Sequence, residues 1–114
     1  MSSLAIRLLP EPLRTEAFGA IGAGYTAIGT ALVNPSRILY MVNTTNALLT
    51  FSLDGVNDHF VIPASTSIVL DLTTNKSDQG GVANISAGTT IYVKGAPGSG
   101  SVYLTTWYGA FGTV

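Results

Sequence analysis

The densest group of side chains that could bind a metal ion lies between Asp54 and His59, in the run Asp-Gly-Val-Asn-Asp-His. Calcium prefers oxygens such as those of Asp54, Asn57 and Asp58, but their spacing lacks the alternating acids and the distal glutamate of an EF-hand loop. His59 is the only histidine of the chain, and one imidazole without partners is a poor ligand set for a transition metal. Because Asx side chains also cap turns, we expect a turn and no metal site, with calcium near Asp54 and Asp58 left open.

Residue types that could support hydrolysis are present, but they are not arranged for it. The chain has no Gly-x-Ser-x-Gly elbow, and Gly98-Ser99-Gly100 is typical of a hairpin turn. Of the six acidic residues only Asp71 falls within an expected strand, so no pair of carboxylates is expected on one face. The absence of cysteine excludes thiolate catalysis, disulfides and cysteine-based zinc sites. We therefore expect a protein that is not an enzyme, with no catalytic residue and no cofactor.

The elements that would position these residues are short β-type runs, separated by Gly, Asn, Asp and Pro at intervals of about ten residues. The expected strands are 17–21, 26–32, 37–43, 48–53, 59–62, 67–72, 89–94 and 101–108. Such spacing predicts an all-β fold in which two antiparallel sheets form a β-sandwich, with the jelly roll as a candidate topology.

Side-chain alternation predicts which strands are buried. In 67–72 it sets Ile68, Leu70 and Leu72 on one face, which we assign to the core. By contrast, 38–42 is apolar on both faces. That strand is expected to be central in its sheet or to lie at an interface.

Residues 1–15 are expected to form an extended N-terminal arm ahead of a β-sandwich domain of residues 16–114. Pro10 and Pro12 each remove a backbone donor and disfavour helix in the residue before them. The apolar side chains of the arm are Leu4, Ile6, Leu8 and Leu9. Such an arm can dock on a neighbouring subunit or fold back over its own sheet as an edge strand, and the sequence leaves both options open.

Charge is scarce in this chain. Charged residues make up 10% of it, against an ordinary share of about a quarter, and the mean hydropathy is +0.42. The five basic residues are spread singly, so no basic stripe exists for nucleic acid. The uncharged stretch 17–33 is rich in glycine and as a helix would rise only about 25 Å, which disfavours a membrane span. The low charge favours a surface that other subunits cover, with a lone β domain coated by Thr, Ser and Asn as the alternative.

Aromatic residues gather towards the C-terminus, and three uses are open for them. They could fill a subunit contact, stack on sugar rings or pair across strands of one sheet. The aromatic residues concerned are Tyr92, Tyr103, Trp107, Tyr108 and Phe111. With the arm, they give the expected interface residues: Leu4, Ile6, Leu8, Leu9, Trp107, Tyr108 and Phe111.

A series of segments forms a familiar pattern over most of the chain after the arm. They are 37–43 (Arg-Ile-Leu-Tyr-Met-Val-Asn), 51–55 (Phe-Ser-Leu-Asp-Gly), Asp58-His59, 62–64 (Ile-Pro-Ala), 70–73 (Leu-Asp-Leu-Thr), Asn75-Lys76, 87–95 (Ala-Gly-Thr-Thr-Ile-Tyr-Val-Lys-Gly) and Val102-Tyr103. In this overall pattern the chain resembles small structural proteins of tailed bacteriophages. No single motif carries the likeness, and it supplies no catalytic residue.

The resemblance implies a virion component that is assembled in the cytoplasm of the bacterial host. Its expected role is a capsid decoration or cement protein that stabilises the head shell, with a head-tail junction or tail component as the alternative. The expected partners are further copies of the chain, as a trimer or larger homo-oligomer, and the major capsid protein or other virion proteins, with neither nucleic acid nor membrane. A carbohydrate-binding β-sandwich module is the alternative from another class.

Overall fold

The protein is all-β and forms a sandwich of two antiparallel sheets, as the sequence predicts. The structure is a computed structural model, and it describes residues 4–73 and 84–113. Its elements are β1 (Leu4–Pro10), β2 (Arg14–Ala17), the 3₁₀ turn η1 (Phe18–Ala20), β3 (Thr26–Ala27), β4 (Ser36–Asn43), β5 (Leu49–Ser52), β6 (Phe60–Ile62), β7 (Thr66–Asp71), β8 (Tyr92–Lys94) and β9 (Ser101–Thr113).

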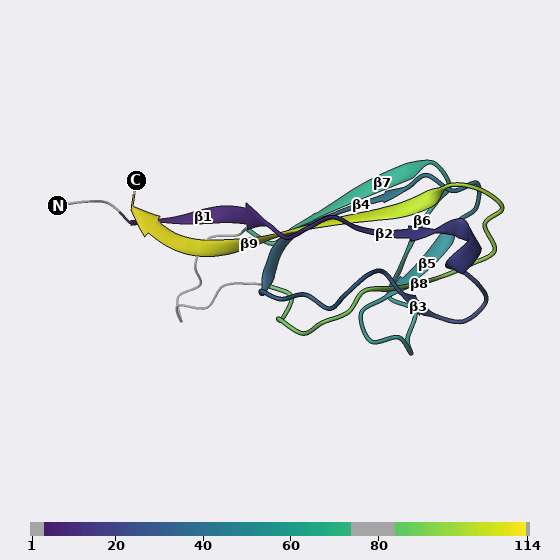
Figure 1. Cartoon of the computed structure of the whole chain (residues 1–114), viewed down its shortest axis with the longest axis horizontal. Helices are drawn as coiled ribbons and strands as arrows, with labels where there is room; N and C mark the ends of the chain where they lie inside the picture. The colour runs from purple at the N-terminus through teal and green to yellow at the C-terminus, as the bar shows by residue number, and fades with distance from the viewer. Residues whose placement is uncertain (1–3, 74–83, 114) are drawn as a thin grey trace.

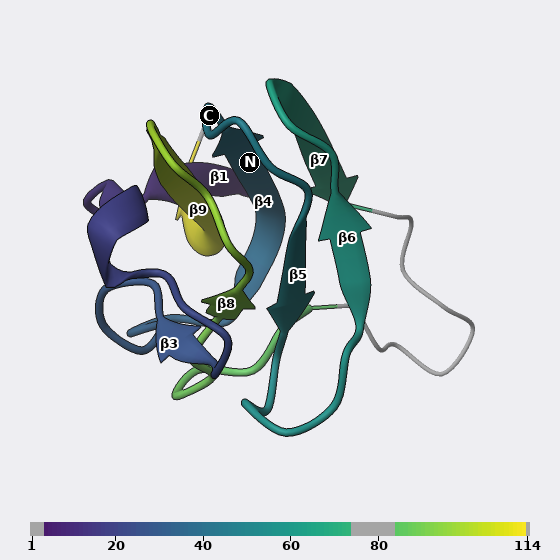
Figure 2. The same cartoon turned by 90° about the vertical axis from the view of Figure 1, so that its right-hand side faces the viewer.

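The larger sheet has the strand order β1-β9-β4-β7, and β2 pairs with β9 beside β1; the smaller sheet has the order β3-β8-β5-β6. Figure 2 shows the two layers with β4 and β9 facing β5 and β8. The chain passes from one sheet to the other at every connection between consecutive strands except β1–β2 and β5–β6. This strand order does not confirm the jelly roll.

The core lies between the two sheets, where alternate side chains of each strand point inward. The larger sheet contributes Leu39, Met41 and Leu104, and the smaller sheet contributes Phe51 and other buried side chains. The ring of Phe51 stacks on that of Phe60 with centroids 5.2 Å apart. Burying such side chains supplies about 1.5–3 kcal/mol each, so this layer carries most of the folding energy.

Three sequence-based expectations about strands are wrong. The expected strand 26–32 is reduced to the two residues of β3, Thr26–Ala27. Residues 17–21 do not form a strand, because η1 closes there through a hydrogen bond from the Ile21 amide to the Phe18 carbonyl (3.1 Å). The strand β2 instead begins at Arg14, within the region expected to be an arm, and ends at Ala17. The segment 96–100 is not a hairpin, because it joins β8 in one sheet to β9 in the other. Gly100 has φ +88, a backbone conformation that glycine adopts without strain.

The strands β4 and β7 follow their patterns in different degrees. As expected, β4 is central, because it pairs with β9 on one side and β7 on the other. Ile68 of β7 packs against the core, but Leu70 is 40% exposed, so its assignment to the core is wrong. Leu70 pairs with the buried Leu39, yet it lies on the outermost strand of the sheet, where one side has no neighbouring strand among the described residues.

The length of β9 gives the molecule its shape. Thirteen strand residues at about 3.3 Å each span about 43 Å, whereas the eight of β4 span about 26 Å. The far end of β9 therefore leaves the sandwich and pairs only with β1 among the described strands. Figure 1 shows this two-stranded ribbon projecting from the body of the protein, whose longest extent is 56 Å.

Candidate interaction surface

The projecting ribbon brings together the two groups of residues expected to form an interface. We define the ribbon as β1 together with residues 107–113 of β9. Its antiparallel register sets Ile6 opposite Phe111, Leu9 opposite Tyr108 and Pro10 opposite Trp107. The apolar arm thus folds back as an edge strand, which was one of its two expected fates. The C-terminal aromatic residues share the same ribbon.

The described side chains of the ribbon are only partly covered. Leu8 is 41% exposed, while Leu9, Trp107 and Tyr108 are half-buried. The side chains of Leu4, Ile6 and Phe111 lie outside the described residues. Arg7 is exposed and is the only charged residue of β1. This part of the protein therefore presents mainly apolar surface to its surroundings.

Both edges of the ribbon are open beyond Tyr108. On one side β1 has no neighbour other than β9 within the described part of the chain. On the other side β4 pairs with β9 only up to Tyr108. A two-stranded ribbon is marginally stable by itself in water, and its unpaired amides and carbonyls can accept another strand. The ribbon thus has the backbone geometry of a docking element.

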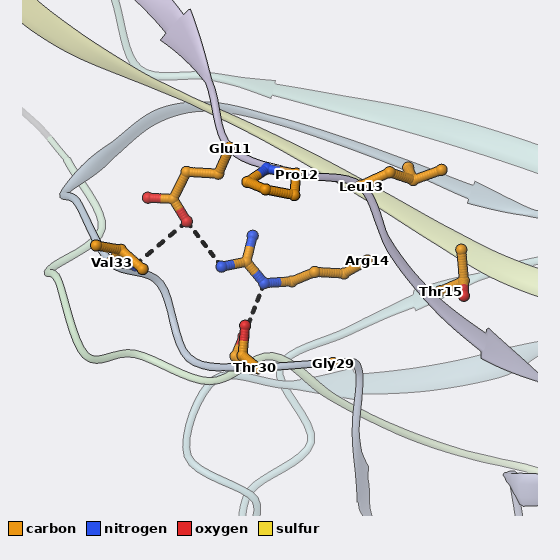
Figure 3. Close-up of a pocket in the computed structure, with 8 residues that line it drawn as sticks. All are labelled: Glu11, Pro12, Leu13, Arg14, Thr15, Gly29, Thr30 and Val33. Atoms are coloured by element: carbon orange, nitrogen blue, oxygen red, sulfur yellow. Dashed lines mark hydrogen bonds and ion pairs between the residues drawn. The ribbon is translucent and has the colours of Figure 1, made fainter.

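A buried ion pair fixes the base of the ribbon to the sandwich. Arg14 Nη2 lies 2.7 Å from Glu11 Oε1, and the two side chains are only 6% and 5% exposed. Arg14 also donates to the carbonyls of Thr30 (2.8 Å) and Ala31 (3.1 Å) and to the Thr106 hydroxyl (3.2 Å). Figure 3 shows the guanidinium between the carboxylate and Thr30. The pair thereby links the β1–β2 corner to the loop before β4 and to β9.

The carboxylate of Glu11 is held in its charged form. It accepts hydrogen bonds from the Asn34 amide (2.7 Å), the Val33 amide (3.2 Å) and the Asn34 side chain (3.1 Å). Burial raises the pKa of Glu11, but the hydrogen bonds from Arg14, Asn34 and Val33 outweigh it and lower the pKa to about 2. Gly29 makes room for the pair, because a Cβ there would lie 2.9 Å from Cγ of Arg14.

A shallow hollow of about 310 Å³ borders this ion pair. Its lining includes Pro12, Leu13 and Val33, and Figure 3 shows the Leu13 side chain turned away from the pair. The polar groups of Glu11 and Arg14 are already occupied by each other and by the backbone. The hollow therefore offers no free charged group to a ligand, and the pair acts as a structural clamp.

The loop considered first for metal binding is a hydrogen-bonded turn. Asp54 accepts from the Val56 and Asn57 amides (2.8 Å each) and from the Ser52 hydroxyl (2.8 Å). These hydrogen bonds hold the pKa of Asp54 well below its usual range, and the bond from the Asn57 backbone amide has the largest effect. The nearest His59 nitrogen, Nε2, is 3.9 Å from Asp54 Oδ2, and Nδ1 accepts from the Leu53 amide (2.9 Å). The oxygens that could bind calcium thus stabilise the turn.

Asp58 of the same loop faces a different strand. It pairs with Lys94 Nζ (2.9 Å) and accepts a hydrogen bond from the Tyr25 hydroxyl, while Lys94 lies 4.6 Å from the centre of the Tyr25 ring. Within residues 4–73 and 84–113, no three acidic or histidine side chains gather as metal ligands would. In the same residues, no helix has the length and apolar character of a bilayer span.

The aromatic residues do not form one platform for a sugar ring. Tyr92 belongs to the smaller sheet, where its ring would lie 3.2 Å from a Cβ at Gly55. Tyr103 and Trp107 lie on the outer face of β9, with Val42 and Ile38 as their cross-strand neighbours on β4, whereas Tyr108 is on the opposite face. Tyr92 and Tyr108 therefore lie away from the face that carries Tyr103 and Trp107, so the aromatic residues named from the sequence are not all on one surface.

Sequence reasoning missed Glu11 and Arg14 as a pair, since both were assigned to an exposed arm. Two opposite charges three residues apart, within a segment that is otherwise apolar or proline, were the available signal. It was also not foreseen that the strand 101–108 continues to Thr113, because Gly109 and Gly112 are unfavourable in strands.

Comparisons with known proteins do not assign a family. No protein-family description and no curated protein matches the sequence. One similar structure comes from work on Bacillus endospore appendages, described as a novel family of disulfide-linked pili: 13% identity, TM-score 0.41, covering 95% of this chain and 89% of that chain. Another is the SPP1 Dit protein, described as a paradigm of hub adsorption apparatus in phages that infect Gram-positive bacteria: 11% identity, TM-score 0.37, covering 89% of this chain and 49% of that chain. Similarity this low carries no argument about function.

Proposed function

We propose that this protein is a non-enzymatic structural subunit of a bacteriophage virion and that it joins its neighbours through the β1–β9 ribbon. The single observation that carries the assembly role is the ribbon itself. Its two strands leave the sandwich, no described strand pairs with either edge beyond Tyr108, and Leu8 is exposed. Docking against a neighbour would cover its apolar side chains and pair its backbone groups. The virion assignment rests on the sequence resemblance described above.

Within the virion, we propose decoration of the capsid shell, with the head-tail junction or the tail as the alternative position. The expected partners are further copies of this chain, as a trimer or larger, and the major capsid protein. A surface with few charges favours contacts formed by apolar burial. Immunogold labelling of intact particles with an antibody against this chain distinguishes shell, junction and tail. Absence of label from purified particles would contradict the virion assignment.

The assembly role can be tested on the purified chain by light scattering coupled to size exclusion at micromolar concentration. We expect an oligomer for the full chain and a monomer for a variant that lacks residues 1–9. This deletion removes most of β1 but keeps Glu11 and Arg14, whereas removal of residues 1–15 would also destroy the clamp.

A point substitution gives a matched comparison. Leu8→Lys places a charge on the ribbon, and Val56→Lys places the same charge on the 78% exposed Val56 in the loop between β5 and β6. We expect only Leu8→Lys to reduce the oligomer, with an unchanged circular dichroism spectrum for both variants. Equal masses for the two variants and the original chain would rule out the ribbon as the contact.

A further inference from the structure

We propose that β7 is the acceptor for the ribbon, so that β1 of one copy adds to the β7 edge of a second copy and extends the larger sheet from molecule to molecule. This inference rests on the proposed function, since it names the partner surface of the same ribbon. The occupant of the β7 edge is therefore a second copy of this chain.

The outer strands of the two sheets differ in length. In the smaller sheet the outer strands are short, with two residues in β3 and three in β6. In the larger sheet the outer strands have seven residues in β1 and six in β7. Proteins commonly block open edges with short strands, lysine, proline or bulges. β7 has no lysine or proline, and its register with β4 is unbroken from Thr66 to Asp71.

Within the described part of the chain, the backbone direction of β7 leaves three residues that can pair outward. The Leu72 amide donates to the Arg37 carbonyl (2.7 Å), so the even-numbered residues of this strand face β4. The amides and carbonyls of Ser67, Val69 and Asp71 consequently point to the open edge.

β1 presents the same pattern along the ribbon. The Glu11 amide donates to the Thr106 carbonyl (2.9 Å), so odd-numbered residues face β9 and the backbone groups of Leu4, Ile6 and Leu8 point outward. Pro10 occupies the next outward position and has no amide hydrogen to offer. The open edge is thus confined to the part of β1 that projects from the body.

The two edges complement each other when copies share one orientation. Across the order β1-β9-β4-β7 every pairing is antiparallel, so β1 and β7 run in opposite directions. A second copy in the same orientation therefore offers β1 antiparallel to β7. The outward-pairing residues Leu8 and Val69 also lie on the same, outer face of the sheet, so the inner and outer faces continue in line from copy to copy.

Charge also favours β1 on β7 over β1 on β1. The single charges of the two strands are Arg7 on β1 and Asp71 on β7, and both side chains are exposed. Arg7 alternates with Leu8 and Asp71 shares the face of Val69, so the two charges lie on opposite faces of the sheet, and pairing of β1 with β7 sets no like charges against each other. Arg7 is the middle residue of β1, so two β1 strands in full antiparallel register would set arginine against arginine. Pairing of β1 with β7 is heterologous, and it generates a ring or a filament.

The first experiment removes one outward donor from β7. Val69→Pro eliminates the amide that faces the open edge and leaves the amides that face β4, while Val69→Thr keeps the shape and the donor as the matched control. We expect light scattering to show loss of the oligomer for Val69→Pro only, with circular dichroism unchanged. An oligomer of original mass in a folded Val69→Pro variant would overturn the β7 assignment.

A second measurement remains decisive if Val69→Pro fails to fold. The chain has no cysteine, so Leu8→Cys and Val69→Cys chains can be mixed and treated with a short bismaleimide, with Val61→Cys on β6 as the control. We expect Leu8–Val69 heterodimers in excess. Preferred Val69–Val69 products, or equal linkage to Val61, would overturn the proposal. If Leu8→Lys is monomeric while Val69→Pro still assembles, the ribbon role stands and only the β7 acceptor is wrong.

Discussion

The Glu11–Arg14 clamp gives the sharpest prediction about stability. Arg14→Met removes the guanidinium but keeps much of the aliphatic side chain. It leaves the Glu11 carboxylate buried without its cation and removes the donors to the Thr30 and Ala31 carbonyls. Breaking a buried ion pair by removing one partner costs about 3–5 kcal/mol.

The pKa of Glu11 gives a second magnitude, which covers all the groups that hold its charged form, with Arg14 before Asn34 and Val33. Its fall from 4.5 to about 2 corresponds to roughly 3 kcal/mol of preference for the charged form in the folded state, at about 1.4 kcal/mol per pH unit. The two figures agree within their precision. We therefore expect Arg14→Met to lower the free energy of unfolding by about 3 kcal/mol, measured by urea denaturation at pH 7.

The pH dependence separates the clamp from ordinary packing. Because the folded pKa of Glu11 lies below its unfolded value, its contribution is present above about pH 4.5 and is lost as the pH falls towards 2. Glu11→Gln lacks this titration. The stability difference between the original chain and Glu11→Gln should consequently shrink over that pH window. A difference that stays constant from pH 7 to pH 2.5, or a loss below about 1 kcal/mol for Arg14→Met, would refute the clamp.

Three further substitutions test how loops and strands are joined, all by urea denaturation. Asn43→Leu should cost about 3 kcal/mol, because the buried Asn43 amide donates to the carbonyls of Ala47, Ile62 and Pro63. Gly100→Ala should cost about 2 kcal/mol or more, since φ is +88 and a Cβ would lie 2.8 Å from the Thr45 Cα. Gly29→Ala should cost about 1–3 kcal/mol, because its φ is +65 and its Cβ would press on Arg14. Losses below about 0.5 kcal/mol at these positions would contradict the packing described.

Patterns within short stretches of the sequence correctly predicted the features that depend on neighbouring residues. The continuous apolar run in 38–42 and the spacing of turn residues are set by neighbours in sequence, so the sandwich and the central place of β4 followed from them. The inward direction of Ile68 followed in the same way. The exposure of Leu70 did not, because it depends on β7 being the outermost strand, and strand order is a long-range property.

The candidate surface was predictable in composition but not in arrangement. Leu8 and Leu9 stood out as apolar, and Trp107 and Tyr108 as aromatic, yet nothing local relates positions that are about a hundred residues apart. Their meeting depends on the register of β1 with β9. The Glu11–Arg14 clamp was not predicted from the sequence for the same reason. The two residues are buried only because the loop that carries Thr30, Ala31 and Asn34 closes over them.

The scarcity of charge has a structural counterpart in how the charges are used. Glu11 and Arg14 neutralise each other out of solvent, and Lys94 is paired with Asp58. Asp54 caps its own turn. Many of the few charged residues thus stabilise corners of the fold. The outer strands β1 and β7 have one charged residue each. An edge with so little charge has little to oppose strand addition. The use of charged residues at the corners therefore leaves the edges of β1 and β7 available for assembly.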